Sequence, residues 1–317
     1  MNSSQIPAGG IVVGVDGSEH SDRAVTWAAR QASVEGRPLD IVHGSGPVPM
    51  HDIGWLAVRG IDEARLAHAL LSGAQAVLDN AQRLVASEWP GVEIRTHLVD
   101  VDPRDALIDA SASAELVVVG SRGRGALRRL ILGSVSSAVA RHAECPVVVC
   151  RPSETPAVRP RVVVGADGTA SSLPVIEFAF RQASLRGMPL TVMHCFFDVI
   201  AATNGPRLVA RRGADDDELD DLRLLLAESV AGFREKFPDV DVEVQLARGL
   251  VDECLLDRAP SAELIVVGRR HASAWARFLE ASCAMAVLER AETTVAVVPE
   301  NPQETSEHVA PAERNPS

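Results

Sequence analysis

Two glycine-rich segments in the first half of the chain contain residue types that can hold a phosphorylated ligand. One is Val15-Asp16-Gly17-Ser18, and the other runs from Gly120-Ser121-Arg122-Gly123 to Gly133-Ser134. Glycine lets a backbone approach an anion closely, because it has no Cβ. Backbone N–H groups at a helix N-terminus carry partial positive charge and attract phosphate. The two segments together therefore indicate a site for an anionic ligand.

The polar residues of these segments suggest how a nucleotide would lie. The Ser134 hydroxyl can add a hydrogen bond to phosphate, and Arg122 and Arg124 can screen phosphate charge. Asp16 suits the other end of the ligand, where a carboxylate accepts hydrogen bonds from ribose hydroxyls or an adenine amine. Taken singly, these residues also fit a turn at Gly123 and Gly125, close packing at Gly133 and a helix cap at Asp16. Their joint occurrence favours the ligand site.

Short apolar runs alternate with helical patterns around these segments. We expect strands at residues 11–15, 39–43, 92–98, 116–119 and 146–149, and helices at 21–35, 61–87, 103–113 and 127–142. Asp102 suits the N-cap of the helix at 103–113, with Pro103 as its first residue. The alternation predicts a five-stranded parallel sheet of order 3-2-1-4-5 with helices on both faces. In that order the two segments flank the point where strand order reverses, which is where such sheets bind ligands.

The second half of the chain repeats the first. The segments 14–43 and 165–194 align without a gap, with about thirteen of thirty positions identical, and Ala114–Gly120 resembles Ala262–Gly268. We expect one domain at residues 8–151 and a second at 159–299. A linker rich in proline and polar residues spans 152–158, and a disordered tail spans 300–317. The fold class is therefore α/β, with two tandem copies of one unit.

The spacing of the glycines resembles a known family. Gly120-x2-Gly123-x9-Gly133-Ser134 matches the G-x2-G-x9-G-[ST] motif of universal stress proteins of the ATP-binding type. The strand ending in Val-Asp-Gly-Ser and the strand ending at His43 match other hallmarks of that family. The chain looks like a tandem universal stress protein of a high-GC Gram-positive bacterium. The resemblance implies a flavodoxin-like fold, also described as adenine nucleotide alpha hydrolase-like. It also implies a cytoplasmic stress-response regulator that binds ATP, with Mg²⁺ or Mn²⁺ on the phosphates and no metal ligand from protein side chains.

The resemblance also implies which residues contact the nucleotide. By motif position, the first group would surround the adenosine and the second would hold ribose and phosphates. The first group is Gly14, Val15, Asp16, Gly17 and Gly44, and the second is Val119, Gly120, Ser121, Arg122, Gly123, Gly133, Ser134 and Val135.

The second copy departs from the motif. It retains Asp167, Gly268 and Ser282, but His271 and Ala281 replace the second and third motif glycines. A histidine ring would stand where phosphate should approach the backbone. We therefore expect the first domain to bind ATP and the second to bind it weakly or not at all.

Composition excludes several functional classes. The chain carries 31 basic and 43 acidic residues, a net charge of −12, and only 3% aromatic residues, which argues against nucleic-acid binding. No apolar run is long enough to span a membrane. Lys236 is the only lysine of the chain, which argues against a site that depends on a P-loop lysine or a Schiff-base lysine. The five cysteines form no C-x-x-C motif and are expected to be small buried hydrophobic residues.

Catalysis is less well supported than binding. No Ser-His-Asp set or carboxylate pair is evident, His43 and His194 suit packed structural positions, and any ATP hydrolysis should be slow. Two alternatives remain, namely a binder of cyclic AMP or another adenine nucleotide, and a protein-interaction scaffold with a vestigial site. We expect the two domains to form a pseudo-dimer through the strands at 147–149 and 295–298, and further homodimerisation is left open.

Overall fold

The computed structural model of the 317-residue chain describes residues 6–46, 63–123, 132–152, 160–196, 207–208, 217–258, 262–269 and 281–300. Arg124, Gly125 and His271 lie outside these ranges, as do residues 153–158 of the expected linker and 301–317 of the expected tail. The side chains of Ala281 and Ser282 are likewise not described.

The first domain is a parallel sheet of order β3-β2-β1-β4-β5, as the alternation of strands and helices predicted. Its elements are β1 (Ile11–Gly14), α1 (Glu19–Glu35), β2 (Leu39–Gly44), α3 (Glu63–Glu88), β3 (Ile94–Val99), α4 (Pro103–Ser111), β4 (Leu116–Gly120), α5 (Ser134–His142) and β5 (Val147–Cys150). The order reverses between β1 and β4, so their carboxyl ends open a crevice at this point.

The second domain repeats this order as β9-β7-β6-β10-β11. One addition was not predicted, a two-residue strand, β8, which pairs antiparallel with β9 at the sheet edge. The elements are β6 (Arg161–Gly165), η2 (Ala170–Ser172), α6 (Leu173–Arg186), β7 (Leu190–Phe196), β8 (Arg207–Leu208), α8 (Asp217–Lys236), β9 (Val242–Arg248), α9 (Val251–Asp257), β10 (Ala262–Arg269), α10 (Ala281–Arg290) and β11 (Thr294–Pro299).

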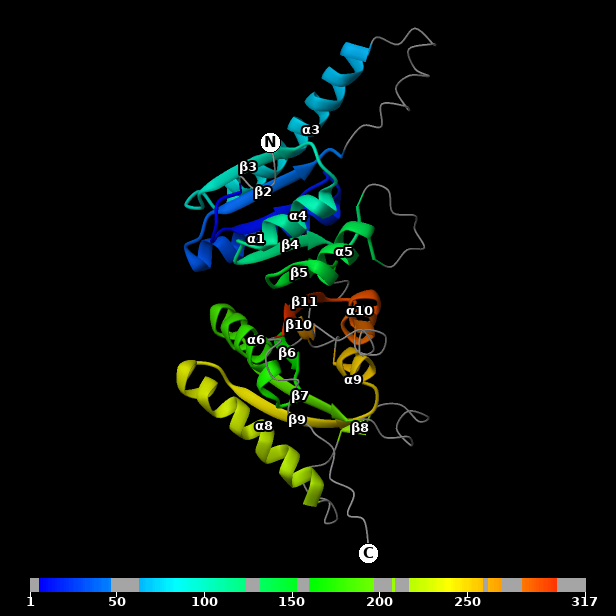
Figure 1. The fold of residues 1–317 in the computed structure, drawn as a ribbon. Helices are drawn as coiled ribbons and strands as arrows, with labels where there is room; N and C mark the ends of the chain where they lie inside the picture. The colour runs from blue at the N-terminus through cyan, green and yellow to red at the C-terminus, as the bar shows by residue number, and fades with distance from the viewer. Residues whose placement is uncertain are drawn as a thin grey trace, which may run out of the picture.

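The two domains share one continuous sheet of eleven strands, because β5 and β11 pair antiparallel at its centre (Figure 1). Val149 faces Val295, and Val147 faces Val297. The expected pairing of the final strands is thus confirmed. It removes an exposed edge from each five-stranded unit.

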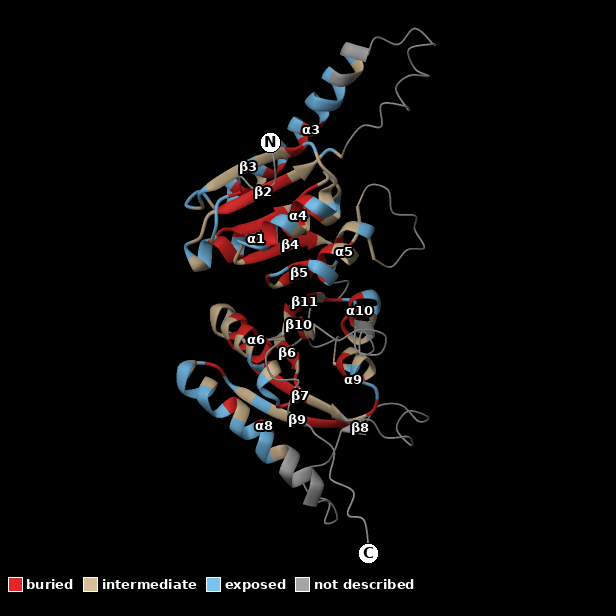
Figure 2. Ribbon diagram, viewed as in Figure 1, coloured by how far each residue is buried: buried red, intermediate tan, exposed pale blue. Residues whose placement is uncertain are grey.

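Helices cover both faces of the sheet, and each face has its own hydrophobic core. Val13 and Ile11 pack on the side of α1 and α3, whereas Val12 packs on the side of α4 and α5. Neighbouring strand residues point to opposite faces, so a fully apolar run such as Ile11–Val13 indicates burial on both sides. Figure 2 shows the inner strands buried, the outer strands β3 and β9 largely intermediate, and much of α3 and α8 exposed.

Several helix ends follow from local chemistry. The side chain of Ser18 caps α1 by accepting the Ser21 N–H, and Asp102 caps α4, with Pro103 opening that helix as expected. The prediction of one helix over 127–142 was wrong at residues 132–133, because α5 begins at Ser134 and neither Leu132 nor Gly133 is helical, while residues 127–131 lie outside the described ranges. Gly133 is its N-cap, with φ −74° and an extended ψ of 154°.

A charged cluster joins α1 and α6 beside the central strands. The Arg181 guanidinium lies 2.8 Å from the Glu35 carboxylate and 2.6 Å from that of Glu115. Arg37 contacts the same two carboxylates, at 3.2 and 3.0 Å. Since the Glu35 side chain is only 6% exposed, these two arginines stabilise its carboxylate charge in a site with little water.

Candidate functional site

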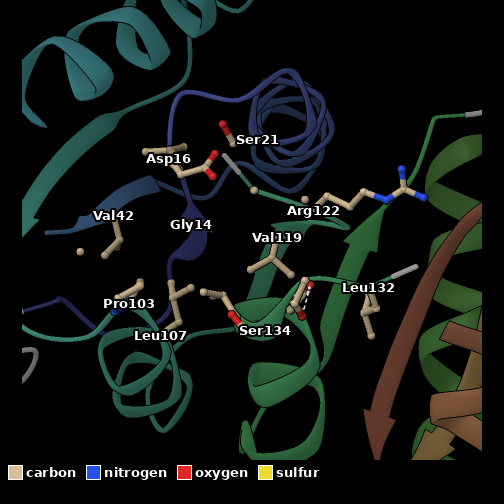
Figure 3. Close-up of a pocket in the computed structure, with 17 residues that line it drawn as sticks. Gly14, Asp16, Ser21, Val42, Pro103, Leu107, Val119, Arg122, Leu132 and Ser134 are labelled. Atoms are coloured by element: carbon tan, nitrogen blue, oxygen red, sulfur yellow. Dashed lines mark hydrogen bonds between the residues drawn. The ribbon is translucent and has the colours of Figure 1, made fainter. Parts of the chain in front are cut away.

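A cavity of about 390 Å³ lies at the carboxyl ends of β1 and β4, where the strand order reverses (Figure 3). Its size lies within the range of small-molecule sites. Eleven of the thirteen predicted residues line it, and they come from both glycine-rich segments. They are Gly14, Val15, Asp16, Gly44, Val119, Gly120, Arg122, Gly123, Gly133, Ser134 and Val135. The fold therefore brings together segments more than a hundred residues apart.

The other two predicted residues lie beside the cavity. Gly17, with φ +75°, allows the turn that leads into α1, and it lines a smaller hollow against α3. Ser121 is buried, and its carbonyl accepts the Gly133 N–H at 2.8 Å. This hydrogen bond holds the start of α5 against the end of β4.

Six lining residues were not singled out from the sequence. They are Ser21, Val42, Pro103, Leu107, Leu132 and Ser136. Most of these form an apolar wall, which includes Val42, Pro103 and Leu107 in Figure 3. Pro103 and Leu107 belong to α4, so the available signal was the position of that helix directly after the third strand of the unit.

Two of the glycines serve the packing of α4 as well as the cavity. A Cβ at Gly14 would lie 2.7 Å from Leu107 Cδ1, and a Cβ at Gly44 would lie 2.8 Å from Pro103 Cα. Both contacts are too short for a side chain to be accommodated without movement. These glycines therefore allow α4 to sit close to β1 and β2 and form the apolar wall.

Asp16 connects the two sides of the crevice. One carboxylate oxygen, Oδ1, accepts the Ser18 N–H at 3.0 Å, which fixes the turn before α1. The other, Oδ2, faces Gly123 so closely that a Cβ there would lie 2.5 Å from it. Asp16 is thus held in place after β1, while its carboxylate faces the segment that follows β4.

The N-terminus of α5 faces the same cavity. Gly133 provides no side chain to cap this helix, and the first-turn residues Ser134, Val135 and Ser136 all line the cavity. The N–H groups of a first helical turn have no partner within the helix. The cavity therefore has a helix N-terminus with partial positive charge as one wall.

Arg122 lines the cavity but directs its charge elsewhere. Figure 3 shows its side chain extending away from Ser134 and Asp16. Its guanidinium adds to the effect of burial in lowering the pKa of Arg151, and it also contributes to the lowered pKa of His20, of which burial is the main cause. Its Nε is buried without a hydrogen-bond partner. Contact with a phosphate would require this side chain to turn toward the cavity.

His43 and its counterpart His194 have structural roles, as expected. The Nδ1 of His43 donates to the Val15 carbonyl at 2.7 Å, and that of His194 donates to the Ala166 carbonyl at 3.0 Å. Each histidine thus ties the end of one strand to the loop that follows its neighbour.

The second domain has a cavity of about 300 Å³ at the equivalent place, where Asp167 and Gly268 are retained. Asp167 repeats the turn of Asp16, because its Oδ1 accepts the Thr169 N–H at 2.9 Å. A difference lies at Gly268, where an added Cβ would clash with the Glu300 carboxylate. This carboxylate therefore occupies space beside the retained motif glycine.

The described lining of this second cavity contains acidic side chains and no basic one of the arginine or lysine type. The acidic residues are Asp167 and Glu300. Elsewhere in the described ranges, no group of three or more His, Cys, Asp or Glu side chains is arranged to hold a metal ion. Nor do those ranges contain a helix with the length and apolar character needed to cross a bilayer.

Comparison with known proteins gives a consistent result over the whole chain. A model of the Universal stress protein family matches residues 9–151 and 159–299. A universal stress protein of Mycolicibacterium smegmatis is 36% identical over 295 residues, which cover 91% of this chain and 96% of the relative. One from Mycobacterium tuberculosis is 35% identical over 300 residues, with the same coverage. The crystal structure of a universal stress protein from Archaeoglobus fulgidus shares the fold, with a TM-score of 0.66, 19% identity, and coverage of 93% of this chain and 99% of that one.

Proposed function

The chain belongs to the universal stress protein family, and from that premise we propose that its first domain binds ATP and acts as a nucleotide-dependent regulator of the stress response. One observation carries the proposal. Asp16 and the uncapped N-terminus of α5 face a single cavity whose remaining wall is largely apolar. These three features correspond to the three chemical parts of a nucleotide.

Each part of ATP has a matching surface. The apolar wall formed by Val42, Pro103 and Leu107 suits the faces of an adenine ring. The Asp16 carboxylate can accept hydrogen bonds from ribose hydroxyls or the adenine amine. The first turn of α5, with the Ser134 hydroxyl, suits the phosphates. Binding therefore needs no lysine.

A divalent cation fits this arrangement. Mg²⁺ keeps several waters and is commonly held by substrate phosphate oxygens, so a cation on the phosphates would need no side-chain ligand from this cavity. When bound, the cation would neutralise part of the phosphate charge. The chain's own residues would position the phosphates through backbone N–H groups.

The site favours binding over turnover. Among the described lining residues, Asp16 and Arg122 are the only ionisable side chains. Arg122 cannot act as a base, and Asp16 would be engaged with the nucleoside end. We therefore expect at most slow hydrolysis, which suits a regulator that reports nucleotide occupancy.

The test compares two matched variants by isothermal titration with ATP and Mg²⁺. Asp16→Asn and Asp167→Asn alter equivalent turns, whose Oδ1 atoms accept N–H groups at 3.0 and 2.9 Å. Hydrogen bonds to a charged group contribute about 1.5–3 kcal/mol, so Asp16→Asn should raise the Kd for ATP about 10- to 150-fold. Asp167→Asn should leave it unchanged.

Other outcomes would favour the alternatives. If cyclic AMP displaced ATP at lower concentration than ATP displaced cyclic AMP, the site would be one for the cyclic nucleotide. If Asp16→Asn abolished ATP binding in vitro while stress survival of cells stayed normal, a scaffold role would be favoured over nucleotide-dependent regulation.

A further inference from the structure

The two ends of α5 are held by different domains. At its N-terminus, the Gly133 N–H donates to the Ser121 carbonyl at 2.8 Å, within the first domain. At its C-terminus, the guanidinium of Arg269, which belongs to the second domain, donates to the Arg141 carbonyl at 2.5 Å and to the Ala143 carbonyl. A helix whose first turn lines the nucleotide cavity therefore has its last turn fixed by the other domain.

The two carbonyls that Arg269 contacts are ones that need a partner from outside the helix. Backbone oxygens in the last turn of a helix have no partner within it. Ala143 is fully buried, so water has little access to its carbonyl. A guanidinium carries several N–H donors in a fixed plane and can serve two carbonyls at once, and its positive charge suits a helix C-terminus. The contact is thus a strong hold on this end of α5.

The second domain receives a similar contact in return. Arg151, which follows β5 in the first domain, donates to the carbonyl of Leu288 and, at 3.3 Å, to that of Glu289 in the last turn of α10. The helix α10 is the counterpart of α5, and Cys283 in its first turn lines the second cavity. Both helices pack in one core on the same face of the sheet (Figure 1). Each therefore runs from the cavity of its own domain to an arginine of the other.

Arg269 has no counterpart of its kind in the first copy. Because Ala114–Gly120 aligns with Ala262–Gly268, the next residues, Ser121 and Arg269, occupy corresponding positions. Ser121 is a small buried residue whose hydrogen bond stays within its own domain. The second copy, in which two motif glycines are replaced, thus carries at the end of β10 a long cationic side chain that reaches the phosphate-facing helix of the first copy.

We propose that Arg269 is a positioning residue for the nucleotide site of the first domain. By holding the C-terminus of α5, it sets where the first-turn N–H groups and the Ser134 hydroxyl meet the phosphates. The inference rests on the proposed function and deepens it, because it gives the second domain a part in the binding of nucleotide by the first.

A hold on one end of α5 reaches the other end because the helix is short and rigid. Its nine residues span about 14 Å at 1.5 Å per residue. Val139 and Ala140 are buried in the core, so the helix stays on the sheet without Arg269, but its tilt is less firmly set. Hydrogen bonds weaken steeply when their distance and angle depart from a narrow range. A tilt of α5 therefore weakens its first-turn contacts with phosphate and leaves the fold in place.

The experiment titrates the full chain with ATP and Mg²⁺ and compares Arg269→Ala with Arg181→Ala. The contacts of Arg181 with Glu35 and Glu115 also join the two domains, but on the opposite face of the sheet from α5. Arg269→Ala should raise the Kd for ATP at least about fivefold, the lower end of typical coupling between two sites. Arg181→Ala should leave the Kd within about twofold of wild type.

Two further measurements separate positioning from a general loss of structure. Arg269→Lys keeps the positive charge but not the planar pair of donors, so its Kd should lie between those of wild type and Arg269→Ala. Hydrogen exchange without nucleotide should be faster across α5 in Arg269→Ala than in wild type, and unchanged across α5 in Arg181→Ala. Circular dichroism of each variant establishes that folding is retained.

The possible failures are distinguishable. If the wild type binds ATP and Arg269→Ala binds it equally well, the positioning role is refuted while the proposed function stands. Equal weakening by Arg269→Ala and Arg181→Ala would also overturn the inference, because the contact between domains in general, and not the hold on α5, would then set the affinity. Unchanged hydrogen exchange across α5 in Arg269→Ala would overturn it as well. Absence of ATP binding by the wild type would refute the proposed function, and this inference with it.

Discussion

Replacing Gly123 with alanine tests how the two sides of the nucleotide cavity depend on one another. The backbone of Gly123 is not in the left-handed region, so alanine adds no strain of that kind. Its Cβ would lie 2.5 Å from Asp16 Oδ2, and among the described residues the only other atom within 4 Å is the Asp16 Cγ at 3.6 Å. The substitution should therefore displace one carboxylate and leave the packing around it intact.

The magnitude follows from what Asp16 would lose. A displaced carboxylate can no longer meet the nucleotide in its bound position, which removes a charged hydrogen bond worth about 1.5–3 kcal/mol. The Kd for ATP should rise about 10- to 150-fold. Because the clash is with the end of a side chain, stability should fall by less than about 1 kcal/mol. Gly120→Ala would differ, since its Cβ would meet the His20 carbonyl oxygen at 2.6 Å.

The assay is a double-mutant cycle measured by titration with ATP. Gly123→Ala should weaken binding in the wild-type background and have little further effect when Asp16 is already asparagine, because both changes act on one contact. Gly73→Ala is the matched control, since a Cβ there meets nothing within 4 Å, and it should leave the Kd unchanged. Full additivity of the two substitutions would refute the reasoning, as would a Kd within twofold of wild type for Gly123→Ala.

Three further predictions concern other parts of the structure. Ser134→Ala should weaken ATP binding about tenfold by removing one phosphate hydrogen bond, and an unchanged titration would contradict this. Arg181→Ala should lower the free energy of unfolding by about 1–3 kcal/mol, because the nearly buried Glu35 loses a partner. The affinity for ATP should stay the same. Urea denaturation measures the free energy of unfolding, and a decrease of less than about 0.5 kcal/mol would count against the prediction. Asp102→Ala should cost about 1 kcal/mol through loss of the α4 cap. Arg104 lowers the pKa of Asp102 to about 2 from 3.8, so this contribution is present above about pH 4 and is lost as pH falls toward 2; the Tm difference between the two proteins should narrow over that interval.

Much of the fold was predictable because local patterns agreed with one another. Apolar runs such as Ile11–Val13 fixed the buried strands, and Asp102-Pro103 marked a helix start. The start of α5 was missed, because Leu127 to Leu132 contains no residue that breaks a helix, while the N-cap is a glycine without a capping side chain. The two-residue strand β8 gave no periodic signal at all.

The residues of the cavity were likewise predictable only in part. Glycine spacing and the acidic residue identified both ends of the cavity, because those features lie in short segments. The apolar wall was not identified, since Val42 and Leu107 are ordinary core residues until α4 is packed against β1 and β2. The Glu300 carboxylate beside Gly268 was not identified either, because these two residues lie far apart in the sequence.

The most direct measurement is the identity and amount of nucleotide released when the purified chain is denatured. The intact motif around Gly123 and Ser134, and the acidic second cavity with Glu300 against Gly268, predict one equivalent of adenosine triphosphate, or its diphosphate product, per chain. Two equivalents per chain would contradict the inequality of the two domains. No bound or bindable adenine nucleotide would contradict the nucleotide site itself.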